Sequence, residues 1–276
     1  MPRGALFHPM VINYSALRAR LSEGQRARLK SLAALAVDGI PAPWSLEMIG
    51  WRFATDKATH GYLEHYARHF EPFRRRPINV LEIGIGTYGP QGGGASLRMW
   101  QRYFTRAQIH GLDIVDKRKH ADKRITVHQG DQGDKRFLVD LASRIGRLQI
   151  IIDDGSHYNH HVMASFEALF PLLEVGGLYV IEDMQTSYLR SMGGSSVDLS
   201  HPGTSMNLVK GLCDEVNSMF IANRQPTPWS RWIESVHVYR NVAFIVKGDN
   251  QSYRLHDYAK TMMAEELPAS TPTLTG

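Results

Sequence analysis

The sequence predicts an α/β fold in which a doubly wound, mainly parallel sheet is covered by helices on both faces. From Ile78 onward, short apolar segments alternate with amphipathic stretches of roughly ten to fifteen residues, which is typical of such a sheet. The alternation ends in two β-branched segments joined by Arg240 and Asn241, a pattern that predicts an antiparallel hairpin. With 276 residues, 43% of them hydrophobic, the chain can enclose a core of ordinary size.

The elements of this sheet are expected in a regular order. Apolar runs ending at Gly or Asp predict parallel strands at 79–83, 108–113, 125–129, 148–153 and 177–182, and the hairpin strands are expected at 236–239 and 242–246. Helical periodicity between them predicts helices around 96–104, 135–143 and 160–173. The stretch 186–205 is rich in Gly and Ser and has little periodicity, so it is expected to form a lid or a long surface loop.

Residues 1–76 are predicted to form a helical cap ahead of a single domain that spans 77–276. Leucines recur near helical spacing in the first part of this cap, and Pro77 ends the helical region because proline cannot continue a helix. Its apolar face, which includes Trp44 and Trp51, is expected either to cover the sheet or to mediate self-association, and a homodimer is the favoured assembly. The expected helices of the cap are 15–37, 46–53 and 61–70.

Composition and charge argue against several classes of protein. The net charge of +5 lies in Arg-rich patches without interleaved aromatic residues, so no nucleic-acid partner is expected. Apolar runs stop short of the roughly 18 residues that a membrane span needs. The single cysteine, Cys213, cannot form an internal disulfide, and the amino terminus does not have the layout of a secretory signal. A cytoplasmic location is therefore expected.

A glycine-rich turn follows the first predicted strand. Gly84, Gly86 and Gly89 formally match the dinucleotide fingerprint, in which glycines let the backbone approach a ligand. The insertion at 89–94 delays the next helix to about residue 95, so the pyrophosphate of NAD would lie away from the helix N-terminus that normally binds it. NAD therefore fits poorly, and an NAD-dependent oxidoreductase remains the alternative enzyme class.

Acidic residues near this turn suit a nucleoside with an amino-acid tail, and S-adenosylmethionine is the expected cofactor. Asp113 closes the second strand, where it would bind the ribose hydroxyls, while the glycine backbone would bind the tail, and Glu82, ahead of the first glycine, is a further cofactor-binding candidate. Asp131, after the third strand, is a candidate for the adenine end. The alternative for Asp113 is a solvated carboxylate at a strand end.

Two further strands end in acidic residues, in the segments Asp153-Asp154-Gly155-Ser156-His157 and Ile181-Glu182-Asp183. Neighbouring parallel strands bring such residues to one edge of the sheet, where this class of fold binds ligands. Clustered carboxylates raise one another's pKa unless a cation neutralises them, and hard oxygen ligands suit Mg²⁺. The predicted metal ligands are Asp154, Glu182 and Asp183.

Side-chain direction limits this prediction, because consecutive strand residues point to opposite faces. Glu182 and Asp183 can reach one ion only if the strand ends at Glu182. His157 lies in the turn and could accept a proton at neutral pH. The alternatives are helix caps and ion pairs without a metal, or a zinc site that includes His160 and His161, although there is neither a second cysteine nor an HExxH motif.

Several motifs in a fixed order resemble the metal-dependent, S-adenosylmethionine-dependent sugar O-methyltransferases of actinobacteria, over roughly residues 50–190. The sequences that carry the resemblance are ATDK at 54–57 with Tyr62, LEIG at 81–84, GGG at 92–94 before LRMW at 97–100, HGLDIVD at 110–116, DDGSH at 153–157 and EDMQT at 182–186. The resemblance implies a Rossmann-like class I methyltransferase sheet. It also implies that Asp154, Glu182 and Asp183 hold Mg²⁺ and that His157 is the general base.

The front of the chain departs from the macrolide-sugar enzymes, which carry a larger auxiliary domain where this chain is short. In length and front segment it looks closer to mycobacterial members that methylate the reducing-end 1-hydroxyl of mannose oligosaccharides in methylmannose polysaccharide synthesis. A mannose oligosaccharide is therefore the expected acceptor. A macrolide or another natural product that bears a deoxysugar is the alternative.

Overall fold

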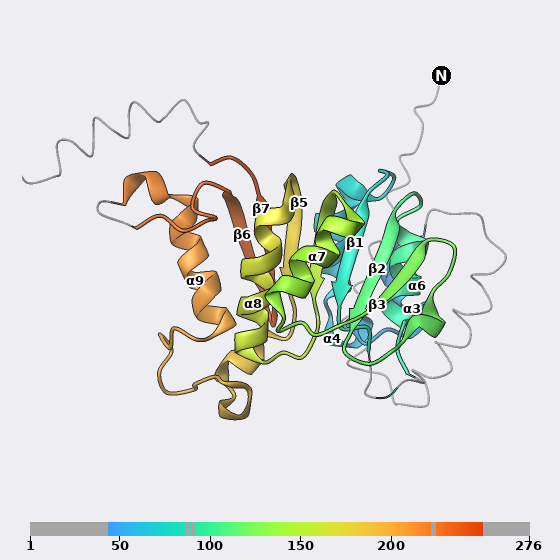
Figure 1. Cartoon of the computed structure of the whole chain (residues 1–276), viewed down its shortest axis with the longest axis horizontal. Coiled ribbons are helices and arrows are strands. Elements are labelled where there is room, and N and C mark those ends of the chain that lie inside the picture. Colours follow the sequence, from blue (N-terminus) through green and yellow to red (C-terminus); the bar gives the residue numbers. More distant parts are fainter. Residues whose placement is uncertain (1–43, 87–88, 90–91, 222–224, 251–276) are drawn as a thin grey trace, which may run out of the picture.

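Seven strands form one mixed sheet in a computed structural model that describes residues 44–86, 89, 92–221 and 225–250 (Figure 1). The strand order is β3-β2-β1-β4-β5-β7-β6, with β1 to β5 parallel and β7 antiparallel to both of its neighbours. This arrangement confirms the predicted fold class. The strands are β1 (Asn79–Ile83), β2 (Gln108–Asp113), β3 (Ile125–Gln129), β4 (Leu148–Asp153), β5 (Leu173–Ile181), β6 (Ile233–Tyr239) and β7 (Val242–Lys247).

The first four strands have the predicted bounds, whereas β5 and β6 begin earlier than predicted. Leu173 pairs with Leu148 across a shift in register, so Gly176 lies inside β5 and not before it. Glycine weakens a strand locally, which explains why the sequence pattern begins only after it. The β6–β7 hairpin is confirmed, and Asn241 in its turn has a φ of 64°.

The helices of the described residues mostly follow the predicted pattern. Polar side chains begin four of them, because Ser45, Asp56, Asp134 and Thr204 each accept a hydrogen bond from a backbone N–H of the first turn. Helices α4 and α9 were not predicted, and the predicted helix 15–37 lies outside the described residues. The helices are α3 (Leu46–Phe53), α4 (Lys57–His60), α5 (Leu63–Phe70), α6 (Ala95–Tyr103), α7 (Lys135–Ile145), α8 (Asn159–Leu169) and α9 (Ser205–Val216).

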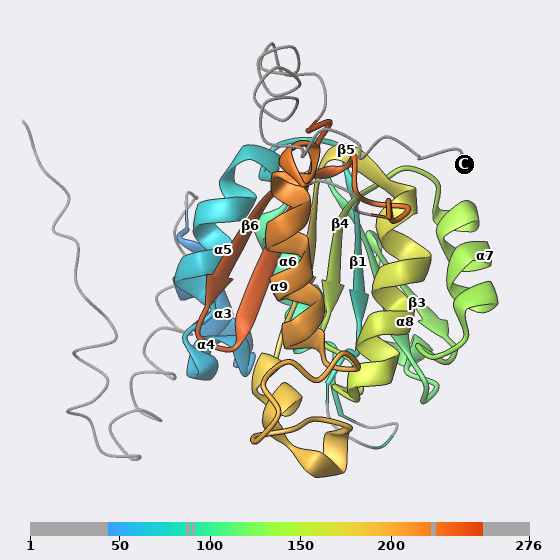
Figure 2. The ribbon, with the colours of Figure 1, turned by 90° about the vertical axis from the view of Figure 1, so that its left-hand side faces the viewer.

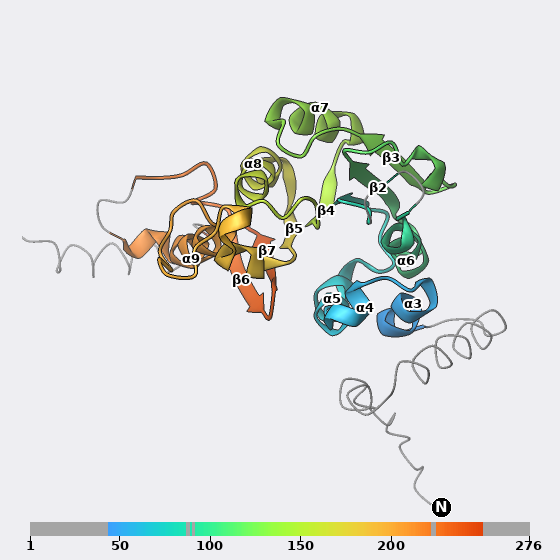
Figure 3. The same cartoon turned by 90° about the horizontal axis from the view of Figure 1, so that it is seen from below.

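Helices cover both faces of the sheet (Figure 3). On one face, Tyr66 and Phe70 of α5 pack against Trp100 of α6, with ring centroids 5.0 and 5.4 Å from the Trp100 ring. These side chains belong to the same buried cluster as Val80 and Ile109 of the sheet, so helices α3 to α6 share their core with the strands. Side chains of α7, α8 and α9 form a second buried cluster on the opposite face.

The segment between β5 and α9 lies near the carboxyl ends of the parallel strands (Figure 2). It contains the 3₁₀ helices η4 (Met184–Tyr188) and η5 (Arg190–Met192). The buried Asn159 amide donates to the carbonyls of Thr186 and Met192, at 3.2 and 2.9 Å, and its oxygen accepts from the Ser205 amide at 2.8 Å. One side chain therefore attaches both ends of the segment to α8. Its use as a lid stays a prediction. Within the described ranges, every helix is too short or too polar to cross a bilayer.

Candidate active site

A cavity of about 500 Å³ opens at the carboxyl ends of the parallel strands. Most of the residues predicted to bind cofactor or metal, or to act as the general base, contribute to its wall. They are Gly84, Gly86, Asp113, Asp131, Asp154, His157 and Asp183. The remaining two predicted residues, Glu82 and Glu182, are buried and are not among those that line it.

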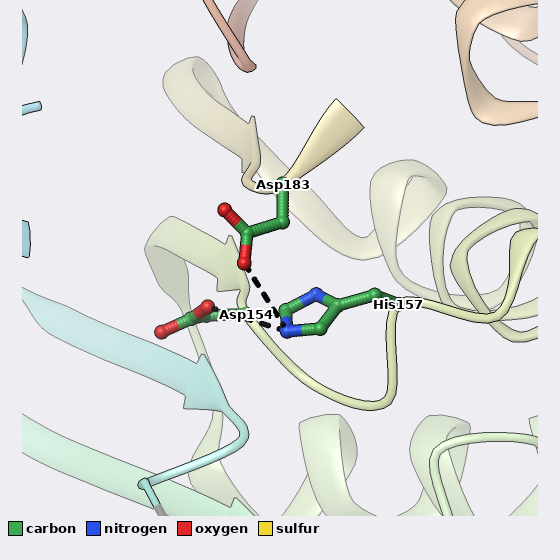
Figure 4. Close-up of side chains that lie close together, drawn as sticks. All are labelled: Asp154, His157 and Asp183. Atoms are coloured by element: carbon green, nitrogen blue, oxygen red, sulfur yellow. Dashed lines mark ion pairs between the residues drawn. The ribbon is translucent and has the colours of Figure 1, made fainter. Parts of the chain in front are cut away.

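Asp154, His157 and Asp183 converge in this cavity from two different turns (Figure 4). His157 Nε2 lies 3.5 Å from Asp183 Oδ2 and 4.0 Å from Asp154 Oδ1. One ligand atom from each of the three residues lies within 4.8 Å of the others, which is close enough for a shared ion. Asp154 directly follows β4, where its amide donates to the Ile83 carbonyl and continues the ladder with β1.

The backbone at both turns adopts a conformation that side chains seldom occupy. His157 has a φ of 58° and Asp183 a φ of 51°. For a residue with a side chain, this left-handed region costs roughly 1–2 kcal/mol, and such strain often accompanies functional sites. The turn at Asp183 begins after β5 has ended at Ile181, so the chain no longer alternates as a strand does. Asp183 lines the cavity, whereas Glu182 is buried and contacts Lys57 in the interior.

Glu182 belongs to a buried acidic cluster around Lys57. Lys57 Nζ lies 2.5 Å from Asp154 Oδ2, 2.6 Å from Glu182 Oε1 and 3.2 Å from Glu82 Oε1. The Tyr66 hydroxyl donates to Glu182. Burial lowers the pKa of Lys57, but the surrounding carboxylates outweigh it and raise that pKa well above its ordinary value. Lys57 is therefore a fixed positive charge inside the protein.

The two acids that converge with His157 differ in the direction of their pKa shifts. Burial raises the pKa of Asp154 above its ordinary value, and the neighbouring Lys57 ammonium opposes this shift. Burial also acts to raise the pKa of Asp183, but the Tyr62 hydroxyl donates to Asp183 Oδ1 at 2.7 Å and His157 lies close by. Together these interactions outweigh the effect of burial and keep the pKa of Asp183 below its ordinary value, so Asp183 is ionised at neutral pH.

Asp113 connects the end of β2 to the glycine turn. Its carboxylate accepts the Val115 amide at 2.9 Å and the Ile85 amide at 3.3 Å, and it pairs with Lys117 Nζ at 2.9 Å. Lys117 in turn donates to the Gly86 carbonyl. These contacts fix the Asp113 carboxylate at the cavity wall, which argues against the solvated strand-end alternative.

The remaining cofactor candidates lie at different depths. Asp131 is exposed at the cavity wall and accepts the Gly133 amide at 2.7 Å. Glu82 is fully buried, where it accepts from the Ser96 hydroxyl at 2.7 Å and pairs with Lys57, so its predicted role in cofactor binding stays a prediction. Gly84 has a φ of 79°, and a Cβ there would lie 2.0 Å from the Asp154 carbonyl oxygen. The close packing of the turn after β1 against the turn after β4 therefore requires glycine at this position, whether or not a ligand is bound.

The donor set of the cavity fits Mg²⁺. Carboxylate oxygens of Asp154 and Asp183 are hard ligands, and Mg²⁺ commonly takes one or two carboxylates together with water. Imidazole is a better ligand for softer metals, which leaves His157 available as a base. His161 is held by the Ser156 hydroxyl at 2.8 Å, and neither it nor His160 joins the converging group. The ligand role predicted for Glu182 stays a prediction, because its Oε1 faces Lys57.

Several residues that hold the site were given no role by the sequence reasoning. Lys57 and Tyr66 lie in the front helices and Tyr62 directly before α5, 116 to 125 residues before Glu182 and Asp183, which they contact. The only available signal was the segment 54–62, which carries part of the family resemblance. Gln132 was also missed. Its amide donates to Asp153 at 2.6 Å, and its oxygen accepts the Ser156 amide at 2.9 Å within the His157 turn.

Comparison with known proteins gives close relatives. The mycinamicin VI 2''-O-methyltransferase of Micromonospora griseorubida is 46% identical over 224 residues, which cover 79% of this chain and 56% of that protein. An 8-demethyl-8-alpha-L-rhamnosyl tetracenomycin-C 2'-O-methyltransferase of Streptomyces olivaceus is 42% identical over 223 residues, covering 79% of this chain and 58% of the relative. The chain thus spans about half the length of the curated relatives it matches. No family model matches it.

A solved structure of a related methyltransferase matches this chain over a longer stretch. The MycE methyltransferase of the mycinamycin biosynthetic pathway, in complex with Mg, SAH and mycinamycin VI, is 41% identical to this chain with a TM-score of 0.74. The match covers 91% of this chain and 67% of that protein. With this identity over two thirds of a solved relative, the chain belongs to the family of actinobacterial sugar O-methyltransferases that these proteins represent.

Proposed function

We propose that this chain transfers a methyl group from S-adenosylmethionine to a sugar hydroxyl, with Mg²⁺ as the metal and His157 as the general base. The observation that carries the proposal is the convergence of Asp154, His157 and Asp183 in one cavity with the glycine turn and Asp113. The solved relative, which binds Mg and SAH, supports both cofactors. The glycine insertion after Gly86 disfavours the NAD-dependent alternative.

The reaction needs a nucleophile, and a free sugar hydroxyl is a weak one. In the proposed step the hydroxyl oxygen attacks the methyl carbon of the sulfonium donor, the carbon–sulfur bond breaks, and its electron pair stays on sulfur to give S-adenosylhomocysteine. The hydroxyl proton moves to His157 Nε2. Asp183 Oδ2, at 3.5 Å from that nitrogen, stabilises the imidazolium that forms. A Mg²⁺ ion held by Asp154 and Asp183 would supply Lewis-acid stabilisation of the developing charge on oxygen.

The donor would lie along the glycine turn. The Asp113 carboxylate is already fixed by backbone amides and by Lys117, so it can bind ribose hydroxyls without reorganising. Asp131 lies at the wall of the same cavity, where it could contact the adenine end. In this arrangement Asp113 and Asp131 belong to cofactor binding, and His157 to the transfer itself.

The proposed acceptor is a sugar attached to a polyketide. The relatives reported above are named for mycinamicin VI and for a rhamnosyl tetracenomycin, and the solved relative binds mycinamycin VI. None of these names includes a mannose oligosaccharide, so they favour the acceptor that the sequence reasoning kept as its alternative. Tyr158 lines the cavity with 41% of its surface exposed and could pack against an apolar aglycone.

Mass spectrometry of reaction mixtures tests the proposal. The protein is incubated with S-adenosylmethionine, Mg²⁺ and either mycinamicin VI, a rhamnosylated aromatic polyketide or a mannose oligosaccharide. We expect one methyl group to be added to a glycosylated polyketide, and no product with Asp154→Asn. Methylation of the mannose oligosaccharide alone would refute the acceptor proposal. A thermal shift with NAD and none with S-adenosylhomocysteine would refute the enzyme class.

A further inference from the structure

The acidic cluster contains two positions where a positive charge can lie, and Lys57 occupies the inner one. Its ammonium contacts carboxylate oxygens of Glu82, Asp154 and Glu182 at 3.2, 2.5 and 2.6 Å. The outer position lies on the cavity side, between Asp154, Asp183 and His157. Asp154 belongs to both positions, because its Oδ2 faces Lys57 and its Oδ1 faces His157.

The two positions differ in their access to water. The side chains of Lys57 and Glu82 are 0% exposed, and that of Glu182 is 1% exposed. Around the outer position, Asp154 is 19% exposed and Asp183 is 17% exposed. Mg²⁺ loses its water ligands reluctantly and usually keeps several of them in proteins. The outer position can therefore accept a hydrated ion, whereas the inner one is dry and suits an ammonium.

Charge explains why the inner position must be filled. Three carboxyl groups face one ammonium there, so without it a buried acidic cluster would be left with no cation. The Tyr66 hydroxyl bonds Glu182 and the Ser96 hydroxyl bonds Glu82, but neither group carries a positive charge. If the ammonium were absent, a divalent ion could bind the carboxylate oxygens that now contact Lys57. The ion would then lie away from His157.

We propose that the Lys57 ammonium is a built-in cation that fills the inner position and confines the divalent ion to the outer position beside His157. Lys57 is thus a positioning residue for the metal. This inference rests on the proposed metal-dependent function. It also gives helix α4, where Lys57 lies, a direct part in organising the metal site.

The test compares two buried lysines. Lys247 Nζ donates to the carbonyls of Phe170, Pro171 and Leu173 at 3.1, 2.8 and 2.7 Å, so Lys247→Ala removes a buried ammonium without touching the acidic cluster. Binding of Mn²⁺ is titrated by electron paramagnetic resonance in the whole chain. We expect one Mn²⁺ per chain for the wild type and for Lys247→Ala, and a second Mn²⁺ for Lys57→Ala. Lys57→Arg keeps the positive charge, so this variant is expected to bind one Mn²⁺ per chain.

The outcomes separate this inference from the proposed function. A single Mn²⁺ per chain in Lys57→Ala overturns the role of Lys57 and leaves the metal site of the wild type intact. A wild type that binds no Mn²⁺ overturns both. If Lys57→Ala does not fold, anomalous diffraction from wild-type crystals soaked in Mn²⁺ gives the answer. A peak beside Asp154 and Asp183, with Lys57 still in place, supports the inference, and a peak between Glu82 and Glu182 overturns it.

Discussion

Replacement of His157 is the most direct test of the proposed chemistry, and its backbone conformation determines which substitution to use. With a φ of 58°, alanine at this position would keep the left-handed strain of roughly 1–2 kcal/mol that the histidine already carries, so its effect would combine backbone strain with the loss of the imidazole. Asparagine tolerates the left-handed region, so His157→Asn removes the proton acceptor and leaves the turn intact. A positioned general base contributes about 10²- to 10⁴-fold to the rate, or about 2.7 to 5.4 kcal/mol.

We therefore expect His157→Asn to lower turnover by about two to four orders of magnitude. Initial rates are measured by mass spectrometry at saturating donor and acceptor. The free energy of unfolding should stay within about 1 kcal/mol of the wild type, as for most substitutions that create neither strain nor cavities. The affinity for S-adenosylhomocysteine, measured by calorimetry, should also be retained. Turnover within about threefold of the wild type would refute the assignment of His157 as base.

Three further predictions follow from named contacts. Tyr62→Phe removes the hydroxyl that donates to Asp183 at 2.7 Å. Hydrogen bonds to charged groups contribute about 1.5–3 kcal/mol. The Mn²⁺ affinity measured by titration should therefore fall by about 10- to 150-fold. Asn159→Ala leaves buried carbonyls and an amide without partners, and should lower the free energy of unfolding in urea by about 1–3 kcal/mol or more. Acid should also remove the contribution that two histidines make to stability. Burial lowers the pKa of His69 and His110 from 6.5 to about 4, so at these two sites the unfolded chain binds more protons between these values, and their contribution to stability falls as the pH drops from about 6.5 to 4. The buried Asp153, whose pKa burial raises to about 6, acts in the opposite direction, so the comparison is with a variant that carries His69→Gln and His110→Gln. Each proton accounts for at most about 1.4 kcal/mol per pH unit, less for partly exposed rings.

Each of these predictions has a clear contradicting result. Tyr188→Phe, at an exposed tyrosine, is the control for Tyr62→Phe, and equal Mn²⁺ affinities in the two variants would exclude a role for the Tyr62 hydroxyl. An unchanged urea midpoint in Asn159→Ala would mean that water replaces its hydrogen bonds. A change in the free energy of unfolding between pH 6.5 and 4 that is the same in the wild type and in the variant with His69→Gln and His110→Gln would show that neither histidine contributes to the pH dependence.

Most of the parallel strands were predictable because each is defined by its own residues. The strands β1 to β4 are apolar runs that end at Gly or at a polar residue, and their predicted bounds are those observed. Two features were not predictable from apolar periodicity. The start of β5 is set by the pairing of Leu173 with Leu148, and the four-residue α4 exists between caps at Asp56 and Gly61 without any apolar periodicity.

The candidate site also has features that the sequence predicts and features that only the tertiary structure determines. The order of strands and the acids at their ends were sufficient to predict that Asp154, His157 and Asp183 come together, because parallel strands deliver their carboxyl ends to one edge. Only the tertiary structure determined which carboxylate oxygen faces the cavity and which faces Lys57, since that depends on a contact across 125 residues and on the backbone turn at Asp183. Local sequence patterns carry no information about such contacts, because the orientation of a buried side chain is set by the elements packed around it.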